Sequence, residues 1–227
     1  DMYNFKKSPF ANYKLYLPFQ VHIEEGVTSI GDYTFSSLFA LSDVTLSNTV
    51  TYIGKKAFRD TGFNTINFPE SVTYIDDSAF ELCLKLEYIN TPKKLTYIGN
   101  SCFFNCWSLK SITFNEELTT IENLAFYECN VLTSVSFLNC QKLKTIKLGA
   151  FYFCVNLISV KIPDTVDTIE PSAFRKCSSL KEVKLPKQLT IINNSIFAYC
   201  CALKSIELPE TLTEICTYSF MYCCSIE

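Results

Sequence analysis

The hydrophobic positions of the 227-residue chain recur with a period of about 23 residues. In each of nine repeats an aliphatic residue is followed three positions later by isoleucine and eight positions later by phenylalanine. The aliphatic residues are Val27, Val50, Val72, Leu95, Leu118, Leu143, Val166, Leu189 and Leu212. This period matches leucine-rich repeats, which have about 20–29 residues, and is too short for helical-pair repeats. The pattern predicts a solenoid, because one such unit cannot bury its apolar face alone.

Each repeat contains two segments with strand patterns. Segments such as "LKEVKL" (180–185) and "LKSIEL" (203–208) alternate apolar and polar residues, which indicates a strand with one buried face. Proline follows this strand in five repeats and ends it, because proline has no amide hydrogen to donate. The "TxI" segment predicts a second short strand, and "AFxxC" predicts a helical or 3-10 turn. The expected fold is a β-dominated solenoid of the α/β horseshoe class, with parallel strands stacked at the 23-residue period.

Phenylalanine and cysteine form columns along this solenoid. Equivalent residues of neighbouring coils are expected about 4.8 Å apart, so the nine phenylalanines from Phe35 to Phe220 should form one aromatic column. Seven of the twelve cysteines stand three residues after this phenylalanine: Cys83, Cys106, Cys129, Cys154, Cys177, Cys200 and Cys223. A line of single cysteines cannot supply the four converging ligands of a zinc site, so we interpret these thiols as buried filling of the turn. The remaining five are placed irregularly, and the sequence does not determine their disulfide state: Cys102, Cys140, Cys201, Cys216 and Cys224.

The repeats divide the chain into residues 1–20, an N-terminal cap or degenerate repeat, and a solenoid over residues 21–227. This solenoid comprises a half unit, eight full units and a ninth unit that ends midway, at "FMYCCSIE". An uncovered last unit would expose a strand edge, so the C-terminal coils are expected to be the least stable and to favour end-to-end self-association.

Composition and motifs give no indication of catalysis. The net charge of −3 gives no attraction to nucleic acid or anionic membranes, and no apolar run reaches the 18 residues of a membrane span. Residues 1–20 contain no uninterrupted apolar core of the kind a secretory signal needs. The single histidine, His22, occupies an outward strand position, and no phosphate-binding loop, nucleophile elbow or metalloprotease motif occurs. We therefore expect no enzyme activity, metal site or cofactor.

The repeat unit "LxxIxLPxxLTxIxxxAFxxC" resembles the BspA-like leucine-rich-repeat family, also called the Treponema pallidum type. Residues 165–186 and 179–197 carry the motif almost complete, and the resemblance extends over residues 21–227. It implies a curved solenoid and, for many members, a surface protein that binds macromolecules. It implies no catalysis and carries over no binding residue.

Outward positions of the first strand offer a polar face to a protein or glycan partner. Small hydroxyl and amide side chains dominate it, and lysines gather toward its C-terminal half. The candidate binding residues are Tyr88, Asn90, Lys110, Thr113, Lys161, Lys181, Lys184 and Lys204. The lysines are interpreted either as a landing patch for an acidic partner or as a solvated surface with Glu182 and Glu207 as cross-strand partners.

Two further features have two interpretations each. Tyr52, Tyr74 and Tyr97 form an outward ladder on the second strand, which would either contact a partner or stabilise the sheet laterally. Asn193 opens the sequon Asn193-Asn194-Ser195, which is either a glycosylation site or a chance match. The expected function is a non-catalytic binding or adhesion module at the cell surface or secreted; the alternative is an intracellular scaffold or a self-associating repeat array.

Overall fold

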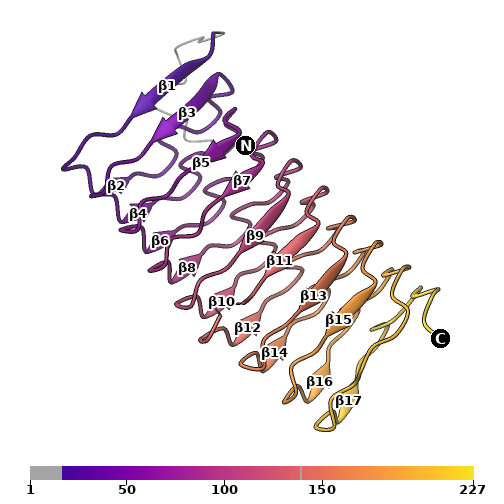
Figure 1. The fold of residues 1–227 in the computed structure, drawn as a ribbon. Coiled ribbons are helices and arrows are strands. Elements are labelled where there is room, and N and C mark those ends of the chain that lie inside the picture. The colour runs from indigo at the N-terminus through magenta and orange to yellow at the C-terminus, as the bar shows by residue number, and fades with distance from the viewer. Residues whose placement is uncertain (1–16, 139) are drawn as a thin grey trace, which may run out of the picture.

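The protein is an elongated solenoid of parallel strands, seen in a computed structural model that describes residues 17–138 and 140–227 (Figure 1). The described residues form 17 strands in two rows. The first row contains β1 (Phe19–His22), β3 (Leu41–Thr45), β5 (Thr65–Ile66), β7 (Tyr88–Ile89), β9 (Ser111–Thr113), β11 (Ser134–Ser136), β13 (Ser159–Lys161) and β15 (Glu182–Lys184). The second row contains β2 (Ser29–Ile30), β4 (Tyr52–Ile53), β6 (Tyr74–Ile75), β8 (Tyr97–Ile98), β10 (Thr120–Ile121), β12 (Thr145–Ile146), β14 (Thr168–Ile169), β16 (Ile191–Ile192) and β17 (Glu214–Ile215). The predicted solenoid of parallel strands is confirmed.

Neighbouring strands pair in the register that the repeat predicts. In the first row Val135 lies beside Ile112, and Val160 lies beside Val183. In the second row Ile146 lies between Ile121 and Ile169. The N-terminal cap predicted for residues 1–20 falls largely on residues 1–16, outside the described residues, and Phe19 and Gln20 belong to β1.

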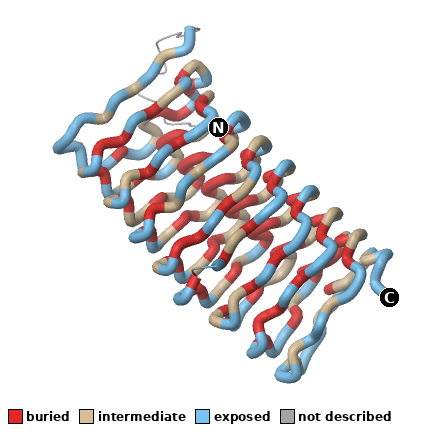
Figure 2. The backbone as a smooth tube through the Cα atoms, in the orientation of Figure 1, coloured by how far each residue is buried: buried red, intermediate tan, exposed pale blue. Residues whose placement is uncertain are grey.

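The interior is made of the predicted columns: buried positions recur along the inner coils, whereas the last coil is almost entirely exposed or intermediate (Figure 2). The nine phenylalanines stack ring on ring, with centroid separations of 5.3 to 5.9 Å. Seven of the nine, from Phe58 to Phe197, have at most 1% of their surface exposed. Because each ring contacts the rings before and after it, the column joins the coils into one continuous core.

The expected helical or 3-10 turns are wrong: the described "AFxxC" segments are non-helical turns. In each coil the residues two before and two after the column phenylalanine have positive φ, as at Lys56 (53°) and Asp60 (61°). This backbone directs peptide groups along the solenoid instead of into a helix, so that Phe58 N–H donates to Ala79 C=O at 2.8 Å in the next coil. The hydrogen bonds between coils offset the cost of left-handed conformations at non-glycine residues.

The seven regular cysteines are free thiols, of which six are buried and Cys223 is partly exposed. Each donates its S–H to the carbonyl oxygen of the column phenylalanine in the preceding coil, as Cys154 does to Phe126 O at 3.2 Å. Burial raises the pKa of the Cys154 thiol to about 12. These cysteine side chains therefore fill the turn, and each supplies a hydrogen-bond donor to a backbone carbonyl group there.

The strand predicted over residues 203–208 is wrong. Its sequence pattern matches β15, yet no strand forms there and β15 is the last strand of its sheet. Leu208 is 47% exposed, whereas Leu185, the equivalent residue of the preceding coil, is 6% exposed. Residues 203–208 form no ladder with β15, and on their outer side the backbone bond found among the described residues is Glu227 N–H to Lys204 O at 3.1 Å.

Candidate binding site

The predicted strand face has two parts. In the occupied part, polar side chains are hydrogen-bonded or ion-paired to neighbouring coils. In the free part, charged side chains have no ion-pair partner among the described residues. In the occupied part, Asn90 accepts from Phe68 N–H at 2.9 Å and donates to Phe68 O at 3.1 Å. Lys110 pairs with Glu87 at 2.5 Å and lies over the ring of Tyr88, 5.0 Å from its centroid. The hydrogen bond to Glu87 is the main cause that raises the pKa of Lys110. These groups hold neighbouring coils together, while the Thr113 side chain in β9 is exposed.

The free part is the lysine stripe, which we define as Lys161, Lys181, Lys184 and Lys204. Lys161 and Lys184 lie directly side by side on β13 and β15, and all four side chains are exposed. Four ion pairs are found within residues 17–138 and 140–227, and none includes a residue of the stripe. Neither Glu182 nor Glu207 thus acts as the cross-strand ion-pair partner that the solvated-surface interpretation assigned to it. The structure leaves a concentration of positive charge on this part of the face.

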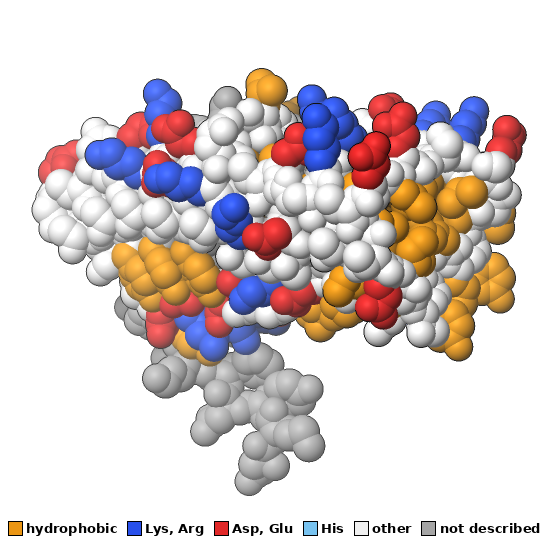
Figure 3. Space-filling model, turned by 90° about the horizontal axis from the view of Figure 1, so that it is seen from below, with side chains coloured by type: hydrophobic (Ala, Val, Ile, Leu, Met, Phe, Trp, Pro, Cys, Tyr) orange, Lys and Arg blue, Asp and Glu red, His pale blue; other side chains and the backbone are white. Residues whose placement is uncertain are grey.

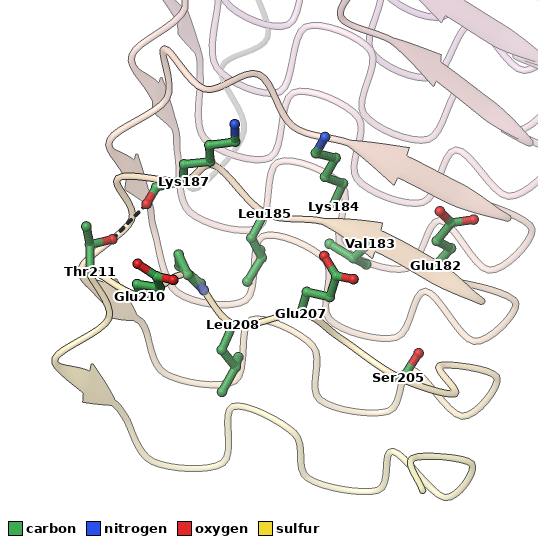
Figure 4. A pocket seen from close by; sticks show the side chains of 11 residues that line it. Glu182, Val183, Lys184, Leu185, Lys187, Ser205, Glu207, Leu208, Glu210 and Thr211 are labelled. Carbon is green, nitrogen blue, oxygen red and sulfur yellow. Dashed lines mark hydrogen bonds between the residues drawn. The ribbon is translucent and has the colours of Figure 1, made fainter.

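A groove adjoins the stripe where the chain departs from β15 (Figure 4). Its volume is about 760 Å³. Val183, Leu185 and Leu208 supply its apolar surface, and Glu182, Lys184 and Glu207 supply charges around it. Thr211 fixes the far side of the groove by donating to Lys187 O at 2.8 Å. The groove therefore combines an apolar surface with charges of both signs.

Backbone groups of β15 face into this groove. Two inner-coil equivalents of Leu185 donate to the following strand, Phe114 to Ser136 O at 2.9 Å and Ile162 to Lys184 O at 3.0 Å. Leu185 has the same orientation, but within the described residues no strand pairs with β15 on this side. The Leu185 N–H therefore points at the groove without a backbone acceptor. A free strand edge of this kind can accept another strand.

The rings of the tyrosine ladder stack on one another and remain partly exposed. The rings of Tyr52 and Tyr74 stack at 5.4 Å, and those of Tyr74 and Tyr97 stack at 4.4 Å. Tyr52 donates to Asp76 Oδ2 at 2.6 Å, and this hydrogen bond is the main cause that raises the pKa of Tyr52. Stacking covers the ring faces, so a sugar cannot lie flat on the middle ring. The geometry favours the sheet-stabilising interpretation.

Figure 3 views the molecule from the side of the second row of strands and shows hydrophobic side chains gathered toward each end, with lysine or arginine and acidic side chains interspersed. The sequon residue Asn193 lies near this row, at the end of β16, and is half-buried. Its Nδ2 atom, where a glycan would be attached, donates to Ile169 O at 2.8 Å. Attachment would require this hydrogen bond to open.

Sequence reasoning missed an aromatic surface along the turns. Phe104 stacks on Tyr127 at 4.6 Å, and the Arg175 guanidinium lies between the rings of Tyr152 and Tyr199, at 5.7 and 5.5 Å from their centroids. The signal was present, because aromatic or basic residues directly follow the column phenylalanine in several repeats. Only the positive-φ turns show that these positions point outward, and most of these rings already contact one another.

Residues 17–138 and 140–227 hold neither a candidate metal site nor a candidate membrane span. There, no three histidine, cysteine or acidic side chains converge in a way that could hold a metal ion. In that part of the chain no helix is long and apolar enough to cross a membrane.

The repeat and its geometry match one family throughout. The model of the BspA type leucine rich repeat region, which comprises 6 copies, matches residues 4–133 and again residues 96–227. The chain belongs to the BspA-type leucine-rich-repeat family. No curated protein sequence matches it.

Several solved structures, among them leucine-rich repeat proteins, have the same fold. A leucine-rich repeat protein from Bacteroides ovatus ATCC 8483 is 27% identical, with a TM-score of 0.51 over 90% of this chain and 70% of that chain. The T. pallidum leucine-rich repeat protein is 22% identical, with a TM-score of 0.55 over 92% and 78%. The pneumococcal vaccine antigen PcpA is 18% identical, with a TM-score of 0.52 over 88% and 63%. The latter two likenesses bear on the fold alone.

Proposed function

We propose that this BspA-type chain is a non-catalytic binding module of a cell-surface or secreted protein, and that the groove beside β15 holds its partner. The observation that carries the proposal is the free edge of β15, where the Leu185 N–H faces the groove without a strand to pair with. Each ladder hydrogen bond at this edge needs a backbone acceptor or donor. A partner segment in extended conformation supplies both.

The free edge favours a protein partner over a glycan. Sugar hydroxyls can hydrogen-bond to an edge, but they do not repeat at the spacing of a strand ladder. The lysine stripe next to the groove adds a preference for acidic side chains, since none of its members has an ion-pair partner within the described residues. The expected partner is therefore a protein with an acidic, extended segment, bound more weakly as salt concentration rises.

Family membership supports the non-catalytic part of the proposal, because leucine-rich repeats generally serve in binding and adhesion. Antibody labelling of intact cells tests the surface location. We expect labelling, or recovery of the protein from the medium, without permeabilisation. Detection only after permeabilisation would support the intracellular scaffold instead.

A selection experiment tests the site. The protein is panned against a displayed library of random peptides, and selected peptides are titrated against Lys161→Glu/Lys184→Glu. We expect acidic peptides, with affinity for the variant lower by tenfold or more and a weaker salt dependence. Lys93→Glu/Lys94→Glu is the matched control, because it makes the same charge change at exposed lysines away from the groove.

Parallel measurements distinguish the other occupants. Equal affinity for both double variants would remove the lysine stripe from the site. Selection of no peptide, together with binding on a glycan array, would replace the protein partner by a glycan. Sedimentation of the isolated protein as concentration-dependent oligomers would support the self-associating array.

A further inference from the structure

Two cysteines outside the buried column stand at the same position of consecutive coils. This position, four residues after the column phenylalanine, points outward along much of the solenoid, as at Phe39, Leu84 and Trp107, which are 66%, 40% and 45% exposed. In the last two coils it is occupied by Cys201 and Cys224, both exposed free thiols. Their exposure therefore follows from the repeat geometry.

The two sulfur atoms lie close to one oxygen atom. Cys201 Sγ and Cys224 Sγ are each 3.5 Å from Tyr222 O, so they are separated by no more than twice that distance. The coils keep their register here, since Tyr199 N–H donates to Met221 O at 2.7 Å. Equivalent residues in paired coils lie about 4.8 Å apart, within the range of about 4.4–6.8 Å between the Cα atoms of a disulfide.

The neighbouring pair, Cys200 and Cys223, has the same register but a different environment. Cys200 donates to Phe174 O at 3.2 Å, and Cys223 donates to Phe197 O at 3.1 Å. Burial raises the pKa of Cys223 to about 11. Both thiols have internal hydrogen-bond partners, and Cys200 is buried while Cys223 is partly exposed, so they serve as an internal comparison.

We infer that Cys201 and Cys224 form a surface dithiol site, which an external disulfide of the glutathione class converts to a Cys201–Cys224 disulfide. One cysteine, after releasing its proton to solvent, attacks a sulfur of the external disulfide and expels one small thiolate. The other cysteine, also deprotonated, attacks the resulting mixed disulfide and expels the second thiolate. One protein disulfide forms, one external disulfide is reduced to two thiols, and the two protons released reprotonate them.

A Cys201–Cys224 disulfide would close a chain loop that contains one wall of the groove. The segment between Cys201 and Cys224 contains Ser205, Glu207, Leu208 and Thr211, which line the groove opposite β15. Closing this loop reduces the conformational freedom of the coil that forms this wall. Oxidation is therefore expected to slow the opening of residues 203–223 while leaving residues 95–137 unchanged.

Equilibration with oxidised and reduced glutathione, acid quenching and peptide mass spectrometry test the site. We expect one cross-link, assigned by fragmentation to Cys201 and Cys224, with the loss of two hydrogen atoms. Cys201→Ser and Cys224→Ser should each abolish the link and leave the remaining cysteine glutathionylated. Cys216→Ser should keep the link, because Cys216 lies at the end of β17, in the second row.

Amide exchange of the oxidised and reduced protein supplies the second readout. We expect exchange over residues 203–223 to slow by about tenfold or more on oxidation, and this change to be absent in Cys201→Ser. A link that includes Cys200, Cys216 or Cys223 would overturn the inference. So would single glutathione adducts at Cys201 and Cys224 without a cross-link in the unsubstituted protein.

Discussion

Residues 180–185 and 203–208 have nearly the same sequence pattern but different structures. "LKEVKL" forms β15 and buries Leu185, whereas "LKSIEL" forms no strand and leaves Leu208 half-exposed. Both have alternating apolar residues and a following proline, so their local preference for a strand is the same. The two segments differ in pairing, because β15 pairs with β13, whereas residues 203–208 pair with no strand among the described residues. The pattern determines which residues face the core, and stacking determines whether the strand forms.

The largest expected effect compares the phenylalanine column in these two regions. Phe126→Ala removes a fully buried ring stacked between two others and should lower the free energy of unfolding by about 3–5 kcal/mol. Phe220→Ala removes a half-buried ring with one stacked neighbour, and should cost about half as much or less. Urea denaturation of both variants measures this. Equal losses would show that the last coil is packed as tightly as the inner ones.

The second largest expected effect is the pH-dependent contribution of the buried thiol of Cys154 to the free energy of unfolding. Cys154→Ala leaves Phe126 O without its thiol donor and should cost about 1–3 kcal/mol at neutral pH. Because burial raises the pKa of Cys154 from 9.0 to about 12, the thiol ionises in the unfolded chain before it ionises in the folded protein. Unfolding then releases a proton, so the thiol's contribution to stability is full below pH 9 and is lost as the pH rises toward 12.

Urea denaturation of the unsubstituted protein and Cys154→Ala at neutral pH and near pH 10.5 measures this loss. We expect the difference between the two proteins to shrink at the higher pH. A constant difference would mean that the thiol is not shielded from solvent. The partly exposed Cys223 should show a smaller change than Cys154.

The smallest effect concerns the lysine stripe, where Lys161 and Lys184 are adjacent like charges. Lys161→Glu places opposite charges side by side and should stabilise the protein by a few tenths of a kcal/mol. Lys161→Glu/Lys184→Glu restores a like-charge pair and should fall within about 0.5 kcal/mol of the unsubstituted protein. Thermal denaturation of the variants at low salt checks this order. Reversal of the order would mean that other charges control this part of the face.

The sequence predicted correctly the parts of the fold that depend on burial of apolar side chains. It did not predict the turn conformation, which depends on hydrogen bonds between coils. Recurrent isoleucine and phenylalanine located the columns and both strand rows, since burial of apolar side chains follows directly from the pattern. The turns were mistaken for helical ones because Lys56 and Asp60 give no sign of positive φ, which the bonds between coils impose.

In the candidate site, too, some features were predictable from the sequence and others were not. Lys161 and Lys184 were located from the outward positions of a strand, and they lie there with their charges unpaired within the described ranges. Asn90 and Lys110 looked equivalent to them, but their side chains bond to adjacent coils. The groove was not predictable, because it results from a strand that the pattern indicated and the structure lacks.

Amide hydrogen exchange at Leu185, compared with Ile162, tests the free edge of β15 most directly. The two residues are equivalent in the repeat, and Ile162 N–H is bonded to Lys184 O while Leu185 N–H faces the groove. We predict that Leu185 exchanges about 100-fold faster than Ile162 in dilute reduced protein. Equal protection of the two amides would show that residues 203–208 close onto β15 in solution, which would contradict both the free edge and the binding site built on it.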